Sequence, residues 1–200
     1  MARGMLAVTR DRNGSPTPVT ITGVQRRCFI DTQPDADSGY PGLYGNAFAW
    51  APENQVRRAT RALSPPTISN ILAMAAPPGG YGEYSRHEII DILTTAYTGF
   101  AAAKSESKHI VSHDARTIIH TGFWGCGAFG GNRTLMTMLQ AVAGGLAGVD
   151  IVFWAFDETG VEIAQDAYEL QELLEKDSSL EGLIGRMVME GFGWGVSDGN

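Results

Sequence analysis

The stretch Thr117-Ile-Ile-His-Thr-Gly-Phe-Trp-Gly-Cys-Gly-Ala-Phe-Gly-Gly-Asn132 decides the fold prediction for this chain. Its first five residues are mostly β-branched and predict a strand. Five glycines follow within ten residues, at positions 122, 125, 127, 130 and 131, and a helix is predicted directly after them. A strand, a glycine-rich turn and a helix start, in this order, gather backbone N–H groups and the positive end of a helix dipole. Such a turn suits a phosphate, because glycines let the backbone approach it closely.

A simpler alternative is that the glycines only let the strand and the helix pack tightly against each other. The density of glycines, together with the aromatic residues among them, favours a ligand. We expect the amides between Trp124 and Asn132 to face a diphosphate. We also expect Phe129 to lie against a sugar ring.

The residues after the turn predict a β-α-β unit. Apolar residues recur at helical spacing, namely Leu135, Met138, Leu139, Val142 and Leu146. The run Asp150-Ile-Val-Phe-Trp-Ala-Phe156 predicts the next strand, and its apolar character is typical of a strand covered on both faces. Further helices are predicted over 161–176 and 180–191, the second opened by a capping box of Ser178 and Glu181.

Shorter elements are predicted before the turn. A capping box of Ser85 and Glu88 predicts a helix over 86–100. The other expected elements are a strand over Pro18–Val24, an ordered surface loop over Asp31–Asn54, a strand over Val56–Leu63 ended by Pro65-Pro66, and a short helix over Thr67–Met74.

The composition favours one compact domain with a sizeable core, at 200 residues and 44% hydrophobic content. The formal charge of -7 argues against a basic surface for nucleic acid, so we expect no direct DNA binding. Cys28 and Cys126 form no pairing framework, which favours a reducing compartment. There is no leader-like apolar region and no membrane-spanning run, so we expect a soluble, intracellular protein.

Thr121-Gly-Phe-Trp-Gly-Cys-Gly-Ala-Phe-Gly-Gly131 resembles the Thr-Gly-Asn-Trp-Gly-Cys-Gly-Ala-Phe-Gly-Gly stretch of poly(ADP-ribose) glycohydrolases. Asp150–Phe156 resembles the family's Asp-Val-Val-Tyr-Phe-Thr-Phe segment, and Ala96-Tyr-Thr-Gly-Phe100 resembles its Ala-Tyr-Cys-Gly-Phe helix end. Ser38-Gly-Tyr40 with Trp50 resembles its Thr-Gly-Tyr…Tyr-Arg-Trp loop. The resemblance implies an α/β fold of the macrodomain kind, a mixed sheet flanked by helices and truncated on its amino-terminal side.

The resemblance also implies a binding site for ADP-ribose. It assigns the diphosphate to the segment Gly125, Cys126, Gly127, Ala128, Phe129, Gly130 and Gly131. It places Trp154 and Phe156 on the two faces of the adenine, and Tyr40 on the loop that closes over that pocket. For Trp154 and Phe156 the alternative is ordinary strand core, and for Tyr40 both interpretations stay open.

The catalytic part of the family pattern has no counterpart in this sequence. In the family, the chemistry comes from a Gly-Gly-Gly…Gln-Glu-Glu signature upstream of the strand that matches Pro18–Val24, and no such run occurs here. We therefore expect an amino-terminally truncated chain with no catalytic residue of its own. Asp157 and Glu158 could replace the catalytic glutamates, but the resemblance places them at the adenine end, remote from the glycosidic bond. A turn or a helix cap is the better interpretation of these two residues. Phe123 replaces the family's asparagine.

Three other candidates for chemistry are weak. His109 and His113 have the spacing of a metal pair but no third ligand nearby, so no metal is expected. Cys126 is a nucleophile only in principle, and a small buried residue is the alternative. No cofactor is expected.

The expected organisation is an irregular segment over 1–17, a partial macrodomain over 18–192 and a flexible tail over 193–200. Three functions stay open: hydrolysis of ribose–ribose bonds in poly(ADP-ribose), binding of ADP-ribose without catalysis, and a relic with neither activity. By resemblance the partners are ADP-ribose or poly(ADP-ribose) and ADP-ribosylated proteins, in the nucleus or cytoplasm, in ADP-ribosylation turnover after DNA damage.

Overall fold

The computed structural model describes residues 9–34, 39, 42–112, 114–176 and 179–199. The chain divides into two compact units, of which the larger comprises Met1–Thr20 with Leu72–Gly199 and the smaller comprises Ile21–Ile71 with Asn200. The domain limits that the sequence analysis drew after residues 17 and 192 stay predictions.

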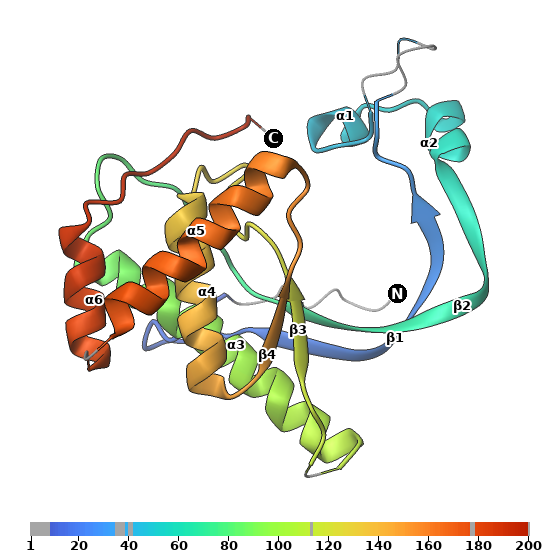
Figure 1. The fold of residues 1–200 in the computed structure, drawn as a ribbon. Helices are drawn as coiled ribbons and strands as arrows, with labels where there is room; N and C mark the ends of the chain where they lie inside the picture. Colours follow the sequence, from blue (N-terminus) through green and yellow to red (C-terminus); the bar gives the residue numbers. More distant parts are fainter. Residues whose placement is uncertain (1–8, 35–38, 40–41, 113, 177–178, 200) are drawn as a thin grey trace. The chain divides into compact units, whose positions relative to one another are not determined.

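The larger unit is built around a β-α-β unit, as predicted. Strand β3 (Ile118–Thr121) leads through the glycine-rich turn into helix α4 (Arg133–Ala147), which returns to strand β4 (Asp150–Phe153). The two strands pair in parallel, with Ile118 opposite Asp150. Figure 1 shows the other helices beside this unit: α3 (Arg86–Ile110) and α5 (Glu158–Glu175) pack on α4, and α6 (Leu180–Met189) packs on α3 and α5. The mixed α/β arrangement of small sheets flanked by helices is thus confirmed.

Helix α4 lies at the centre of the core because almost all of its face towards α3 and α5 is apolar. Asn132 caps its start, where the side-chain Oδ1 accepts a hydrogen bond from the Leu135 N–H at 3.0 Å. Gly148 ends it in the left-handed conformation, with φ of 64°. The helix side chains that are completely buried include Leu135, Met136, Met138, Leu139 and Ala143. Each large one contributes roughly 1.5–3 kcal/mol through burial.

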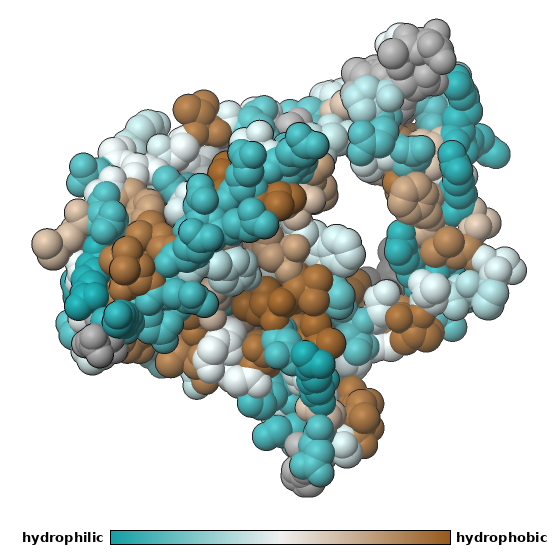
Figure 2. Space-filling view, in the orientation of Figure 1, coloured by the Kyte–Doolittle hydropathy of each residue, from teal (hydrophilic) through white to brown (hydrophobic). Residues whose placement is uncertain are grey.

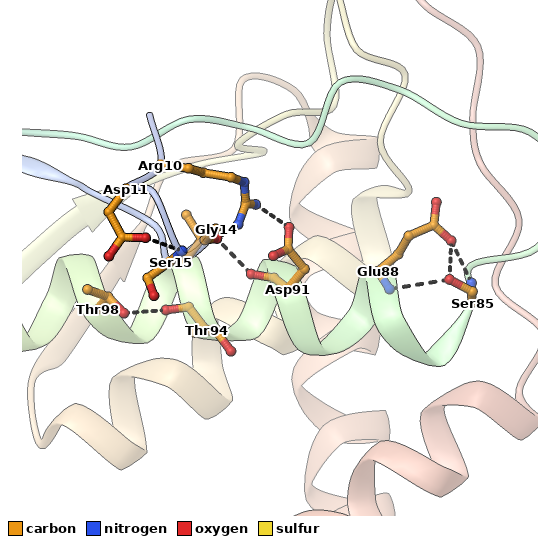
Figure 3. A network of polar contacts seen from close by, with 10 residues as sticks. Arg10, Asp11, Gly14, Ser15, Ser85, Glu88, Asp91, Thr94 and Thr98 are labelled. Atoms are coloured by element: carbon orange, nitrogen blue, oxygen red, sulfur yellow. Dashed lines mark hydrogen bonds and ion pairs between the residues drawn. The ribbon is translucent and has the colours of Figure 1, made fainter. Parts of the chain in front are cut away.

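Helix α3 begins at the predicted capping box and runs longer than predicted. The Ser85 Oγ accepts a hydrogen bond from the Glu88 N–H, and the Glu88 carboxylate accepts one from the Ser85 N–H at 2.7 Å (Figure 3). The helix continues to Ile110, ten residues beyond the predicted end, because the segment 101–110 contains good helix formers and no Gly or Pro. The polarity of that segment reflects an exposed face, not a loop.

A short turn near the amino terminus is held against α3. The Asp11 carboxylate accepts hydrogen bonds from the N–H groups of Asn13 and Ser15, both at 2.8 Å. Arg10 donates to the Gly14 carbonyl oxygen at 2.8 Å and pairs with Asp91 of α3. Figure 3 shows this turn beside the same helix that carries the capping box.

Three predictions for the segment that includes the smaller unit are wrong. Strand β1 (Val19–Ile30) runs six residues past the predicted end and pairs with strand β2 (Thr60–Ala73). The segment predicted as a strand from Val56 begins as helix α2 (Glu53–Ala59), in which Arg57 pairs with Glu53 one turn away. Pro65-Pro66 lies inside β2, and Thr67–Ala73, which the sequence predicted as most of a short helix, belongs to the same strand. A two-stranded sheet tolerates proline because each strand has an outer edge that needs no N–H. Helix α1 (Asn46–Ala49) is a single turn in the predicted surface loop.

Three boundaries in the larger unit differ from the sequence prediction. Strand β4 ends at Phe153, and α5 begins three residues earlier than predicted because Asp157 caps it, accepting a hydrogen bond from the Gly160 N–H. Ser179 caps α6, whereas the predicted cap Ser178 lies outside the described residues. Among the described residues β4 is covered on one face only. Its other face carries the exposed Val152. Figure 2 shows an apolar area over β3 and β4.

Candidate functional site

The glycine-rich turn joins β3 to α4 and closes on itself through backbone hydrogen bonds. The Gly131 N–H donates to the Gly125 carbonyl oxygen at 2.9 Å, and the Gly130 N–H donates to that of Gly127 at 2.9 Å. Gly125 adopts a φ of 76° and Gly130 a φ of 62°, in the left-handed region that favours glycine. A Cβ atom on Gly131 would lie 2.8 Å from the Gly125 oxygen. These three glycines are therefore required by the shape of the turn itself.

The amides of the turn divide into two groups. Those of Trp124, Cys126, Gly130, Gly131 and Asn132 donate to acceptors within the protein. The expectation that the amides between Trp124 and Asn132 face a diphosphate is therefore wrong for Cys126, Gly130 and Gly131, whose N–H groups close the turn. In the turn from Trp124 to Asn132, four N–H groups make no hydrogen bond to a described residue: those of Gly125, Gly127, Ala128 and Phe129. They lie just before the amino-terminal end of α4, where the helix dipole also favours an anion.

A basic side chain lies at this end of α4. The guanidinium carbon of Arg133 is 4.9 Å from the ring centroid of Phe123, a cation–π contact. The Phe123 ring in turn meets Phe153 of β4 edge to face, with centroids 5.0 Å apart. Phe123, which replaces the asparagine of the family pattern, therefore packs between the helix and the strand and presents no hydrogen-bonding group to the turn.

Cys126 is half-buried in the turn. Burial raises the pKa of its thiol to about 12, although the charge of Arg133 acts in the opposite direction. The thiol is consequently protonated at neutral pH, and a thiolate nucleophile is not available there.

The aromatic residues predicted for the adenine are exposed and lie beyond the end of β4. Trp154 is 58% exposed and Phe156 90% exposed. The Trp154 indole N–H donates to the His120 Nδ1 at 3.1 Å, and the two rings lie 6.0 Å apart. No ring contact joins Trp154 to Phe156 within the part of the chain that the structure describes. Tyr40 lies outside the described residues. The assignment of these three residues to adenine stays a prediction.

Gln140 is a positioning residue that the sequence analysis did not recognise. Its side chain is completely buried in α4 and donates to the carbonyl oxygens of Gly122 and Met136, each at 3.1 Å. Its Oε1 accepts a hydrogen bond from the Thr121 hydroxyl at 2.5 Å. The available signal was one amide side chain within the apolar face of the helix, since a buried polar group needs partners.

The remaining candidates do not converge on the turn. The described residues contain no group of three or more His, Cys, Asp or Glu side chains that could hold a metal ion. His109 contacts the Ser105 carbonyl oxygen of its own helix, and His113 lies outside the described residues. Asp157 serves as the cap of α5, in agreement with the cap interpretation. No described helix is long and apolar enough to cross a membrane.

A comparison with protein families shows to which family this chain is related. The model of the poly(ADP-ribose) glycohydrolase catalytic region, described as having the macrodomain fold, matches residues 32–162. The chain belongs to the poly(ADP-ribose) glycohydrolase family. The match contains the glycine-rich turn, α4 and β4, so the resemblance and the macrodomain type of α/β fold expected from the sequence are confirmed.

Individual relatives agree with this family. Poly(ADP-ribose) glycohydrolase 1 of Caenorhabditis elegans is 33% identical over 70 residues, which is 35% of this chain and 9% of the relative. Poly(ADP-ribose) glycohydrolase 2 of the same organism is 34% identical over 64 residues, 32% of this chain and 13% of the relative. Probable poly(ADP-ribose) glycohydrolase 2 of Arabidopsis thaliana is 24% identical over 183 residues, 76% of this chain and 34% of the relative. The matched region thus spans between 9% and 34% of each glycohydrolase's own length.

Proposed function

We propose that this chain binds ADP-ribose, or the ADP-ribose units of poly(ADP-ribose), and that the turn from Gly125 to Gly131 holds the diphosphate. Membership of the poly(ADP-ribose) glycohydrolase family supports the ligand. The observation that carries the proposal is the set of amides without a protein acceptor, those of Gly125, Gly127, Ala128 and Phe129, before the start of α4.

Backbone amides suit a diphosphate in a protein of this charge. The chain carries a formal charge of -7, so a phosphate must be bound by local groups and not by the overall field. A hydrogen bond to a charged oxygen contributes about 1.5–3 kcal/mol. Two or three such bonds, with the guanidinium of Arg133 at the same end of α4, are enough for measurable affinity.

The other end of the ligand is assigned to the exposed aromatic residues. Trp154 and Phe156 present flat, exposed faces beyond the end of β4, which suits stacking against adenine. Phe129, 46% exposed in the turn, is assigned to the ribose beside the diphosphate.

Titration calorimetry with the purified chain tests the proposal. We expect heat of binding with ADP-ribose, weaker binding with adenosine monophosphate, and competition by inorganic pyrophosphate. The difference between the two nucleotides reports the diphosphate contact, because both carry the adenine. No heat at millimolar ADP-ribose would contradict the proposal.

Hydrolysis of poly(ADP-ribose) is the second candidate, favoured by the family alone. The printed sequence contains neither a Gly-Gly-Gly nor a Gln-Glu-Glu run, the pattern to which the resemblance assigns the chemistry. Incubation of labelled polymer with the 200-residue chain separates the two candidates. Release of ADP-ribose above the blank would support hydrolysis, and binding without release would support a binding module.

The partners and the cellular setting follow from the proposed ligand. We propose ADP-ribosylated proteins as partners, in the nucleus or cytoplasm, during turnover of ADP-ribosylation after DNA damage. A peptide carrying ADP-ribose should bind the chain, whereas the same peptide without the modification should not. Fluorescence microscopy of the tagged chain tests the location, and accumulation outside both compartments would contradict it.

A further inference from the structure

We infer that the segment Trp194–Asp198 sets the direction of the peptide groups in the glycine-rich turn, with Trp194 and Ser197 as positioning residues. The effect on the turn is a property of the protein alone. The consequence for ADP-ribose rests on the function proposed above.

The segment binds the carbonyl side of the turn at three points. The Gly195 N–H donates to the Gly130 carbonyl oxygen at 2.8 Å, and the Ser197 hydroxyl donates to that of Ala128 at 2.7 Å. The Asp198 N–H lies 3.4 Å from the Gly127 oxygen, at the long end of hydrogen-bonding distance. Three carbonyl dipoles that would repel an anion are thus turned towards this segment.

Because the peptide group is planar, these contacts of the carbonyl groups also fix the direction of the neighbouring N–H groups in the turn. In a planar trans peptide, the C=O of one residue points opposite to the N–H of the next. The Ala128 oxygen is held by the Ser197 hydroxyl, so the N–H of Phe129 must point away from the carboxyl-terminal segment. The Gly127 oxygen accepts the Gly130 N–H and lies 3.4 Å from the Asp198 N–H, so the N–H of Ala128 points away from both donors. These are two of the four amides that have no acceptor among the described residues.

Trp194 anchors the segment through a second set of contacts. Its indole stacks on the ring of Tyr84, with centroids 4.1 Å apart and an angle of 17°. The backbone N–H of Trp194 donates to the Gly82 carbonyl oxygen at 2.8 Å. The Tyr84 hydroxyl accepts the Asn132 N–H at 3.0 Å, and the Asn132 side-chain amide donates to the Gly193 carbonyl oxygen at 2.9 Å. Tyr84 therefore links Trp194 to the residue that caps α4.

Two glycines fit closely against this segment. A Cβ atom on Gly130 would lie 2.8 Å from the Ser197 nitrogen, and one on Gly80 would lie 2.4 Å from the Trp194 indole. At Gly130 the missing side chain thus makes room for the carboxyl-terminal segment, which explains this glycine without a ligand.

Two variants of the full chain test the inference, with amide hydrogen exchange and calorimetry as readouts. Ser197→Ala changes an exposed residue and removes its one hydrogen bond to the turn, together with the bond that its hydroxyl accepts from the Gly199 N–H. Trp194→Ala removes the stacked anchor. Trp194→Phe retains a ring against Tyr84 and should restore the behaviour of the native chain. Ser112→Ala is the matched control, because its side chain makes no hydrogen bond among the described residues.

We expect faster exchange of the Gly130 and Gly131 amides in Ser197→Ala and Trp194→Ala without ligand, because these amides close the turn. For Ser197→Ala we expect ADP-ribose affinity to fall about 2- to 12-fold, the equivalent of one hydrogen bond, with thermal unfolding unchanged. Unchanged exchange and affinity in both folded variants would overturn the inference. If the native chain binds no ADP-ribose, only the proposed function fails: faster exchange then still supports the inference, and unchanged exchange overturns it.

Discussion

The side-chain amide of Gln140 donates a hydrogen bond to the carbonyl oxygen of Gly122, 3.1 Å away, where β3 passes into the glycine-rich turn. The same side chain bonds to Thr121 in β3 and to Met136 in α4. One buried residue of the helix therefore connects the strand, the turn and the helix, and it does so without exposure to solvent.

Replacement of Gln140 by leucine should destabilise the chain. Leucine is close in size but leaves the Thr121 hydroxyl without its acceptor and removes one of the two donors to the Gly122 oxygen, which keeps the Trp124 N–H. The loss costs about 1–3 kcal/mol. Unfolding in urea measures this loss. Gln165→Leu, at an exposed position of α5, should change the free energy of unfolding by no more than about 0.5 kcal/mol. Equal effects of the two substitutions would contradict the role of Gln140.

Replacement of Gly131 by alanine should weaken ADP-ribose binding, because the new Cβ atom would lie 2.8 Å from the Gly125 oxygen and force the turn open. We expect a loss of about tenfold or more, which is 1.4 kcal/mol or more, in calorimetry. Gly145→Ala is the control: its Cβ atom meets nothing within 4 Å in α4, and alanine should stabilise the helix by about 0.5–1 kcal/mol. Undiminished affinity in the folded Gly131 variant would exclude the turn as the diphosphate site.

The capping box of α3 should make stability depend on pH. Hydrogen bonds from the Ser85 side chain are the main cause that lowers the pKa of Glu88 below its ordinary value. A carboxylate with a lowered pKa in the folded state contributes stability above its unfolded pKa, and this contribution is lost as the pH falls through the folded value. Glu88→Gln should therefore destabilise the chain at pH 7 and have little effect at a pH below the folded-state pKa of Glu88.

Unfolding at a series of pH values measures this effect. Glu169→Gln is the matched control, since Glu169 is exposed on α5 and its side chain makes no hydrogen bond in the described ranges. A Glu88 effect that stays constant from neutral to acid pH would show that the ionised carboxylate does not contribute.

Lys104 of α3 should stabilise the end of α4. Its Nζ donates to the carbonyl oxygens of Ala147 at 2.9 Å and Gly148 at 2.8 Å, where the helix dipole is negative. We expect Lys104→Met to cost about 1 kcal/mol of unfolding free energy, and Lys108→Met, exposed on the same helix, to cost little. Thermal unfolding compares them, and a larger loss for Lys108→Met would refute the capping role.

The two cysteines should react at different rates with a thiol reagent. Cys28 is exposed, whereas burial raises the pKa of Cys126 to about 12. At pH 8 we expect one fast-reacting thiol in the native chain and two after unfolding, with the fast reaction abolished in Cys28→Ser. Rapid modification of Cys126 in the folded Cys28→Ser chain would show that the turn opens readily.

The family and the β-α-β unit were predictable from the sequence, because both depend on local signals. Strand, glycines and helix follow one another within 17 residues, from Thr117 to Arg133, and the structure has them in that order. The capping box of Ser85 and Glu88 was also predictable, since the two residues lie within one helical turn. The predictions of element type that failed concern Val56–Met74, where Pro65-Pro66 indicated a break. Pairing with β1, which lies about thirty or more residues away in the sequence, made Thr60–Ala73 a strand.

The sequence by itself determined that a glycine-rich turn precedes α4 and that the chain has no lysine there to neutralise a phosphate. Only the tertiary structure decided which amides of that turn are left without an acceptor. The reason is physical: a glycine can point its peptide group either way, so its direction comes from distant contacts. Here Gln140 holds the start of the turn, and Ser197 and Gly195 hold its carbonyl side.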